Sequence, residues 1–228
     1  MKLSVIMPVY NERATIAEIV RRVRAVPLEK EILIIDDAST DGTRDWLLTC
    51  NEPDVRVFLQ PLNRGKGAAV RTGLQQAIGD IAVIQDADLE YDPADFPHLV
   101  APIVAGEAQV VYGSRFLARG RRATAFWHFA GNRLLTALSN LFTGQRLTDM
   151  ETCYKAVRMD LLRRIELDSD GFDIEPELTA KISRLGVEIR EVPISYDSRG
   201  YGEGKKIGWR DGLRTVRAIL RYGLGRNR

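Results

Sequence analysis

The chain has 228 residues, of which 45% are hydrophobic and 28% charged, and its formal net charge is +2. This composition is typical of a globular protein, excludes a disordered chain, and favours one domain with a complete core. Two cysteines, Cys50 and Cys153, and two histidines are too few for a disulfide framework or a zinc site of the usual spacing. We therefore expect both thiols to be reduced, as in the cytosol.

Neither a signal peptide nor a membrane-spanning helix is predicted. The polar cluster that begins at Tyr10 interrupts the first apolar run too early for a signal peptide. No apolar run approaches the roughly 20 residues that cross a bilayer. The sequence therefore excludes secretion and membrane spanning as main interpretations.

The small net charge conceals two basic segments. Residues 115–133 carry a net charge of +5 and residues 199–228 one of +7, which leaves −10 for the rest of the chain. An acidic body with two basic segments predicts contact with an anion, for which phosphates, lipid headgroups and nucleic acid are the candidates.

Strands and helices are predicted to alternate over the first half of the chain. Short apolar runs predict buried strands, and apolar residues at helical spacing predict the helices between them. The alternation predicts an α/β fold, with a Rossmann-like, doubly wound, mostly parallel sheet and helices on both faces. The predicted strands are 3–7, 31–35, 55–59, 81–85 and 109–112, and the predicted helices are 12–26, one through 46–48, 65–77 and 94–105.

The second half of the chain is less regular. A glycine-rich segment precedes a basic amphipathic helix at the C-terminus. The predicted elements are helices over 126–142, 174–185 and 207–222, and strands over 153–157 and 187–192.

The most specific motif follows the predicted strand 81–85. Asp86 and Asp88 lie two residues apart at the end of a buried strand, so their carboxylates can converge on one hard cation. Mg²⁺ or Mn²⁺ held in this way takes substrate phosphates as further ligands, and Glu90 offers a third carboxylate. The alternative is a solvated acidic loop that caps the helix after Pro93. A DxDxT phosphatase is disfavoured, because its aspartate pair belongs on the first strand.

Further polar clusters lie at the same predicted sheet edge, where such sheets bind ligands. Asp36 and Asp37 follow a buried strand and can accept hydrogen bonds from a base N–H or a ribose hydroxyl. The alternative is a helix cap near Thr43, which Asp41 can also supply. The loop 63–67 resembles a phosphate cradle but matches neither GxxxxGK[ST] nor GxGxxG. A P-loop enzyme and a nicotinamide dehydrogenase are therefore disfavoured.

Four motifs in this order resemble family 2 glycosyltransferases of the GT-A fold, and within them the dolichol-phosphate, or polyprenyl-phosphate, mannosyltransferase branch. They are PVYNE at 8–12, DDASTDGT at 36–43, NRGKGAAVRTG at 63–73 and DAD at 86–88. The branch is supported by GSRF at 113–116, LTDMETCYKAVR at 147–158 and SRGYGEGKK at 198–206. The resemblance implies a GT-A catalytic domain over residues 1–206 and a separate basic amphipathic helix over 207–228.

The same resemblance implies the site residues. The donor nucleotide-sugar is expected to bind along the three strand ends and a basic pair in the loop near residue 200, and the acceptor phosphate at two arginines. The implied donor residues are Pro8, Tyr10, Glu12, Ile35 and Asp37 for the nucleoside, Asp86, Ala87 and Asp88 for the diphosphate, Arg115 for the sugar, and Arg199 and Lys205 for the donor phosphates. The other implied residues are Asp86, Asp88 and Glu90 for the metal, Arg115 and Arg133 for the acceptor phosphate, and Asp88, Arg115 and Asp149 as catalytic residues.

The implied reaction is inverting transfer of a hexose, first of all mannose from GDP-mannose, to polyprenyl or dolichyl phosphate. Mg²⁺ or Mn²⁺ on Asp86 and Asp88 is expected to stabilise the departing diphosphate. A phosphate acceptor arrives deprotonated and needs no base. In relatives that glycosylate a hydroxyl, an aspartate placed like Asp149 acts as the base, whereas here we expect it to orient Arg115 or the acceptor.

Two alternative functions stay open: the same fold with UDP-glucose or UDP-N-acetylglucosamine as donor, and a non-catalytic nucleotide-sugar-binding module. We expect the protein on the cytoplasmic face of a membrane, bound peripherally to lipid or to a membrane partner subunit. In this arrangement the C-terminal helix turns Leu213, Val216 and Leu220 toward lipid. The alternative is that this helix packs on protein. Nucleic acid is not an expected partner, because no recognition-helix or aromatic-basic signature is present.

Overall fold

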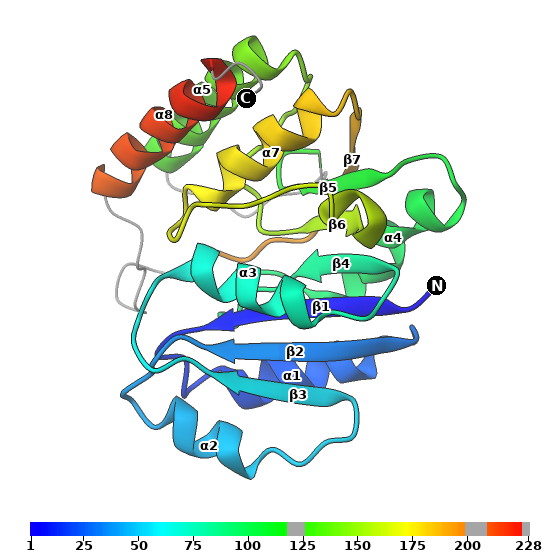
Figure 1. The fold of residues 1–228 in the computed structure, drawn as a ribbon, viewed down its shortest axis with the longest axis vertical. Coiled ribbons are helices and arrows are strands. Elements are labelled where there is room, and N and C mark those ends of the chain that lie inside the picture. The colour runs from blue at the N-terminus through cyan, green and yellow to red at the C-terminus, as the bar shows by residue number, and fades with distance from the viewer. Residues whose placement is uncertain (118–125, 199–208, 225–228) are drawn as a thin grey trace.

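The computed structural model describes residues 1–117, 126–198 and 209–224, and within them seven strands form one sheet in the order β3-β2-β1-β4-β6-β5-β7 (Figure 1). The strands are β1 (Leu3–Val9), β2 (Lys30–Asp36), β3 (Val55–Leu59), β4 (Ile81–Ile84), β5 (Val110–Ser114), β6 (Lys155–Arg158) and β7 (Ile189–Pro193). The helices are α1 (Ile16–Ala25), α2 (Thr43–Thr49), α3 (Lys66–Gln76), the short 3₁₀ helix η1 (Pro93–Asp95), α4 (Phe96–Val104), α5 (Phe126–Thr143), α6 (Met159–Leu162), α7 (Ile174–Arg184) and α8 (Trp209–Leu224).

The predicted α/β class with a mostly parallel sheet is confirmed. β1 pairs in parallel with β2 and β4, β2 with β3, and β5 with β7. β6 is antiparallel to both β4 and β5, and it joins the two parallel parts of the sheet. The carboxyl ends of β1, β2 and β4 consequently meet at one edge.

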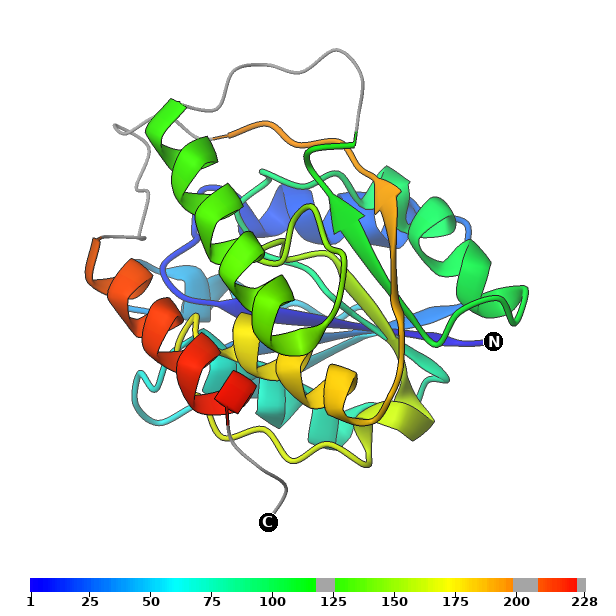
Figure 2. The ribbon, with the colours of Figure 1, turned by 90° about the horizontal axis from the view of Figure 1, so that it is seen from above.

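Helices cover both faces of the sheet (Figures 1 and 2). Successive residues of a strand point to opposite faces, so each apolar strand supplies two cores. Val5 and Ile32 belong to the core beneath α1 and α4, whereas Ile6, Leu33 and Ile35 belong to the one beneath α3 and α7. All five side chains are fully buried, which is why these strands are continuous apolar runs.

Two predicted boundaries at the N-terminus are wrong. β1 does not end at Met7 but continues through Pro8 to Val9. β4 pairs with β1 only as far as Ile6, so no partner on that side needs the N–H that proline lacks. α1 begins at Ile16 rather than at residue 12, because residues 11–13 are hydrogen-bonded to the loop after β2.

The C-terminal helix α8 packs on α5 and α7 in a layer beside the sheet (Figure 2). Thr215, Ala218, Ile219 and Tyr222 are buried in this contact, so the alternative that the helix packs on protein is confirmed. Its opposite side remains exposed, with Leu213 61% accessible.

Both cysteines are free, as predicted. Cys153 is buried, and burial raises the pKa of its thiol well above the usual value, so the thiol stays neutral. No helix in the described ranges is long and apolar enough to cross a membrane.

The N-terminus of α3 approaches the backbone of residues 169–171 so closely that only glycine fits. A Cβ at Gly67 would overlap the carbonyl oxygen of Ser169, and one at Gly65 would lie 2.5 Å from that of Asp170. Gly65 also has φ +100°. Close packing therefore accounts for Gly65 and Gly67 in the loop 63–67.

We predict that Gly67→Ala lowers the free energy of unfolding by about 1–3 kcal/mol, because a backbone carbonyl must move. Gly131→Ala in α5 is the matched control, since its Cβ would meet nothing within 4 Å. The control is expected to be neutral or to stabilise the helix by up to about 1 kcal/mol. Urea denaturation of both variants measures the difference, and equal stability would contradict the close approach.

Candidate active site

The loops after β1 and β2 are joined by hydrogen bonds, as the shared sheet edge predicts. The backbone N–H of Asn11 donates to Ser39 Oγ at 2.9 Å, and that of Thr40 donates to Asn11 Oδ1 at 2.8 Å. The N–H of Glu12 donates to Thr43 Oγ1 at 3.0 Å. The motifs at 8–12 and 36–43 therefore form one surface.

Three non-glycine residues with positive φ follow the ends of β1, β2 and β4. They are Asn11 (φ 54°), Ala38 (61°) and Leu89 (64°). Such conformations cost roughly 1–3 kcal/mol each and are found where function demands a backbone shape. The unusual backbone of these three loops therefore indicates the same edge of the sheet as the candidate site that the polar side chains indicate.

The two aspartates after β2 have different partners. Asp36 is fully buried and forms an ion pair with Arg44 at 2.7 Å. Asp37 accepts the backbone N–H of Arg64 at 2.9 Å and that of Gly65 at 2.7 Å, and so fixes the start of α3. The N-cap residue of α2 is Gly42 rather than an aspartate, and Asp41 Oδ1, one residue earlier, accepts the N–H of Thr43 at 3.0 Å.

Of the other predicted nucleoside contacts, Tyr10 is 37% exposed and lies on the loop with Glu12. Ile35 is fully buried in the core beneath α3, where a Cβ on Gly73 would lie 2.7 Å from its Cδ1. The side chain of Ile35 is therefore a core residue, and only the backbone at this position can face a nucleoside. Pro8 is likewise buried within β1.

Asp86 is paired with a lysine that the sequence analysis did not single out. Lys66 Nζ lies 2.9 Å from Asp86 Oδ1 and 3.1 Å from Oδ2, and 3.1 Å from Glu175 Oε1. Burial opposes the charge of Lys66, but the carboxylates of Asp86 and Glu175 outweigh it and raise its pKa. The start of α3 thus connects Asp37 to Asp86.

Asp86 and Asp88 offer carboxylate oxygens, the ligand type that a hard cation prefers together with phosphate and water. Both carboxylates follow the end of β4, and Asp88 Oδ1 accepts the N–H of Glu90 at 3.1 Å. Glu90 Oε2 accepts the hydroxyl of Tyr196 at 2.9 Å. No three acidic, histidine or cysteine side chains form a metal-binding group in the described part of the chain. The structure therefore does not bring Glu90 to the aspartate pair as a third ligand.

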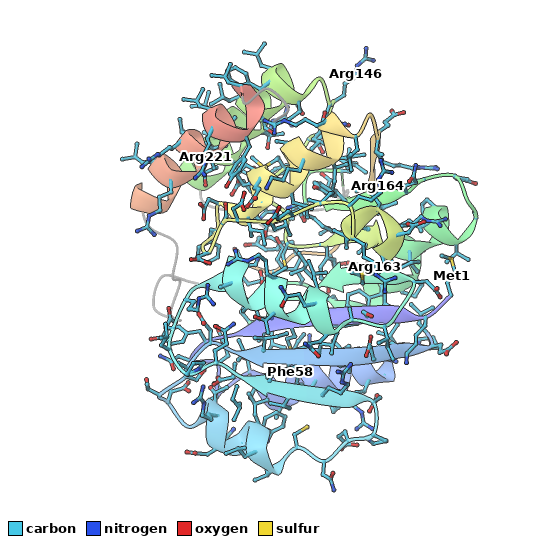
Figure 3. All side chains as sticks on the ribbon, viewed as in Figure 1. Met1, Phe58, Arg146, Arg163, Arg164 and Arg221 are labelled. Atoms are coloured by element: carbon cyan, nitrogen blue, oxygen red, sulfur yellow. The ribbon has the colours of Figure 1, made fainter. Side chains whose placement is uncertain are left out.

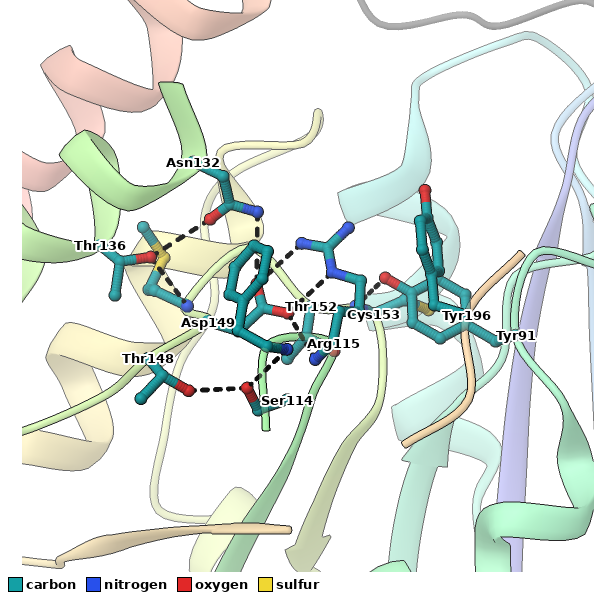
Figure 4. Close-up of polar contacts among 12 residues, drawn as sticks. Tyr91, Ser114, Arg115, Asn132, Thr136, Thr148, Asp149, Thr152, Cys153 and Tyr196 are labelled. Atoms are coloured by element: carbon teal, nitrogen blue, oxygen red, sulfur yellow. Dashed lines mark hydrogen bonds and ion pairs between the residues drawn. The ribbon is translucent and has the colours of Figure 1, made fainter. Parts of the chain in front are cut away.

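Arg115 and Asp149 form a bidentate ion pair at the end of β5 (Figure 4). Arg115 Nε lies 2.7 Å from Asp149 Oδ2, and Nη2 lies 2.8 Å from Oδ1. Asp149 is fully buried and also accepts the backbone N–H of Arg115 and the amide of Asn132. Asp149 thus orients Arg115, which is one of the two roles that the sequence left open.

Neighbouring groups hold this pair from both sides. Glu191 on β7 accepts the backbone N–H groups of Thr148 and Asp149 at 2.8 and 2.9 Å. The ring centroid of Tyr196 lies 5.1 Å from the Arg115 guanidinium carbon. Arg133 donates to the Thr148 carbonyl at 3.3 Å, so both predicted acceptor arginines contact the 148–149 segment.

Several of these residues were missed by sequence reasoning. Glu175 and Glu191 lie on predicted elements without a motif, and Tyr196 follows the last strand. Lys66 lies within the recognised NRGKG string, which was the available signal. The predicted donor-phosphate residues Arg199 and Lys205 lie outside the described residues.

The profile described as Glycosyl transferase family 2 matches residues 4–166. The chain belongs to glycosyltransferase family 2. It is 34% identical to an undecaprenyl-phosphate mannosyltransferase of Micrococcus luteus, over 98% of this chain and 95% of that protein. It is 31% identical to a dolichol-phosphate mannosyltransferase of Pyrococcus furiosus, over 97% of this chain but 62% of that protein. Other curated relatives are similarly longer, and this chain spans 53% and 62% of two of them.

Solved structures confirm the GT-A fold of this glycosyltransferase. Glucosyl-3-phosphoglycerate synthase of Mycobacterium tuberculosis, crystallised with Mn²⁺, UDP and glucosyl-3-phosphoglycerate, is 26% identical with a TM-score of 0.74, over 99% of this chain and 81% of that one. The same enzyme with Mn²⁺, UDP-glucose and glycerol 3-phosphate is 25% identical with a TM-score of 0.73. Membership of this family contradicts the alternative of a non-catalytic binding module.

Glu151 of this glycosyltransferase has a buried carboxyl oxygen and interacts electrostatically with Arg115 and Asp149. Its Oε1 is buried and has no hydrogen-bond partner among the described residues. Burial raises the pKa of the carboxyl from 4.5 to about 7, although Lys155 and Arg115 act in the opposite direction. In the unfolded chain the carboxyl ionises first, so the folded state loses stability as the pH rises from about 4.5 to 7.

We predict that Glu151→Gln is more stable than the wild type at pH 8, by at most about 3 kcal/mol, since one pKa unit is worth about 1.4 kcal/mol. The advantage shrinks as the pH falls and is lost below about pH 4.5, where the carboxyl is protonated in both the folded and the unfolded state. Urea denaturation at pH 5 and pH 8 measures it. Glu29→Gln, at an exposed position, is the control and should show no such difference. An equal offset at both pH values would contradict the prediction.

Proposed function

We propose that this glycosyltransferase moves a hexose, with inversion, from a nucleotide-sugar to polyprenyl phosphate. The names of the M. luteus and P. furiosus relatives support a lipid-phosphate acceptor. The observation that carries the proposal is the Arg115–Asp149 pair. Asp149 is fully buried and both of its oxygens accept hydrogen bonds from Arg115, so it is poorly placed to remove a proton from an acceptor. A phosphate acceptor, which is already ionised, needs no such base.

In this proposal the acidic residues bind the metal ion and the basic residues bind the acceptor phosphate. Asp86 and Asp88 would hold Mg²⁺ or Mn²⁺, which when bound neutralises the diphosphate as it leaves. The fold neighbours crystallised with Mn²⁺ support this part of the proposal. Arg115, held rigid by Asp149, orients the acceptor phosphate toward the anomeric carbon, and Arg133 adds a second positive charge.

GDP-mannose is the proposed donor, because the M. luteus and P. furiosus relatives are named mannosyltransferases. A UDP-sugar is the second candidate, because the solved neighbours contain UDP or UDP-glucose. Tyr10 and Glu12, which would contact the nucleoside, do not discriminate between guanine and uracil by their residue types.

We expect the purified protein with Mn²⁺ to transfer labelled mannose from GDP-mannose to undecaprenyl phosphate, measured as label extracted with the lipid. UDP-glucose and UDP-N-acetylglucosamine, tested in parallel, identify the nucleobase of the donor. Absence of transfer to lipid phosphate from all three donors would overturn the proposal.

The same assay with Asp149→Asn tests the absence of a base. The variant keeps the shape of the side chain but removes the counterion of Arg115, which should impair the positioning of the acceptor phosphate. Because this acceptor needs no base, transfer to undecaprenyl phosphate is expected to fall only partly. A polyprenol, which offers a hydroxyl in place of the phosphate, is the control acceptor and should receive no sugar from either protein. Complete loss of lipid-phosphate transfer by a folded variant would assign Asp149 an essential catalytic role.

The proposal includes peripheral binding to the cytoplasmic face of a membrane. Exposed leucines on α5 and α8 lie beside exposed arginines, a composition that suits anionic lipid. Arg221, which Figure 3 shows on α8, is one of them. The exposed leucines are Leu134, Leu141, Leu213, Leu220 and Leu224.

We predict that the double variant Leu213→Glu with Leu224→Glu loses most of its co-sedimentation with phosphatidylglycerol vesicles. Leu48→Glu with Ile78→Glu is the matched control, because these residues are 67% and 66% exposed on other elements. The control should sediment like the wild type. Equal sedimentation of both variants would mean that α8 does not contact lipid, and would leave a protein partner as the attachment.

A further inference from the structure

Four ionised side chains of alternating sign form a buried row behind the aspartate pair. Asp86 contacts Lys66, Lys66 contacts Glu175, and Glu175 Oε2 contacts Lys155 Nζ. Lys155 is fully buried, and Lys66 and Glu175 have side chains only 10% and 4% exposed. Two positive and two negative charges balance, so the row is neutral as a whole.

The row holds Lys66 between two carboxylates. Glu175 is fixed in turn, because Lys155 also donates to the carbonyls of Met150 and Thr152. Lys66 cannot leave Asp86 freely, since its backbone is held by Asp37 through Gly65 and its ammonium group by Glu175. Both oxygens of Asp86 lie within 3.1 Å of the ammonium nitrogen.

We propose that Lys66 is a positioning residue that acts as a resident cation on Asp86 and sets how strongly the site binds a divalent cation. This inference rests on the proposed function only in assigning Asp86 to the diphosphate site. Lys66 orients the carboxylate and also competes for it by occupying its oxygens and repelling a second positive charge. Glu175 limits that repulsion, because it neutralises part of the charge of Lys66.

Charge variants of the row distinguish this role from a merely structural one. Lys66→Met leaves the row with one net negative charge, and we expect Mn²⁺ to bind about tenfold more tightly. Glu175→Gln leaves one net positive charge and should weaken Mn²⁺ binding by about the same factor. The double variant is neutral again and should return to within about threefold of the wild type.

The measurement is the free Mn²⁺ concentration, followed by electron paramagnetic resonance in protein without nucleotide or lipid. The matched control is Lys181→Met, whose ion pairs are with Asp168 and Glu177 instead, and it should leave Mn²⁺ affinity unchanged. Thermal denaturation of each variant reports its folding. If Lys66→Met does not fold, the isosteric Glu175→Gln still tests the direction of the change in Mn²⁺ affinity.

Opposite shifts of Mn²⁺ affinity in the two single variants support the proposal. Weaker binding in both, unchanged binding in both, or no Mn²⁺ binding by the wild type would overturn it. Sugar transfer to undecaprenyl phosphate by the wild type is scored separately. The role of Lys66 can therefore be refuted while the proposed reaction is supported, and the proposed reaction can be refuted while the role of Lys66 is supported.

Discussion

The stability of the fold depends on neutralising several carboxylates that lie at the carboxyl-end edge of the parallel strands. Asp36 is neutralised by Arg44, Asp86 by Lys66 and Asp149 by Arg115. Asp37 instead receives backbone N–H groups. An unpaired buried charge costs several kcal/mol, so each partner stabilises the fold. The positions of α3 and of the 148–149 segment follow from these pairings.

The two sides of the site use this constraint differently. On the side proposed for the donor, the carboxylate of Asp86 is held by a lysine, which is a compact point charge. On the side proposed for the acceptor, the planar guanidinium of Arg115 is held in a bidentate pair and lies against the ring of Tyr196. Glu90 joins the sides, because its carboxylate accepts the hydroxyl of the same tyrosine. The first side thus places one point charge between two carboxylates, and the second fixes a planar group by two parallel contacts.

The features that depend on a local residue pattern could be predicted from the sequence. The buried strands before Asp37 and Asp86 are continuous apolar runs, so their existence and their shared edge followed from periodicity and the crossover rule. The antiparallel direction of β6 did not, because a four-residue strand carries no signal of its direction. The Lys66–Glu175 contact joins residues 109 positions apart, and only the docking of α7 brings them together. Ile35 was assigned to the nucleoside, yet its side chain faces the core, since a motif fixes a position but not which atoms face the ligand.

The burial of Cys153 has a practical consequence. Its thiol lies at the base of the site with a raised pKa, so thiol reagents, which attack the thiolate, are expected to spare it. The chain has one other cysteine, Cys50, which is half-buried after α2. The sequence thus offers a single expected attachment point for a fluorescent dye, and no other cysteine has to be replaced first.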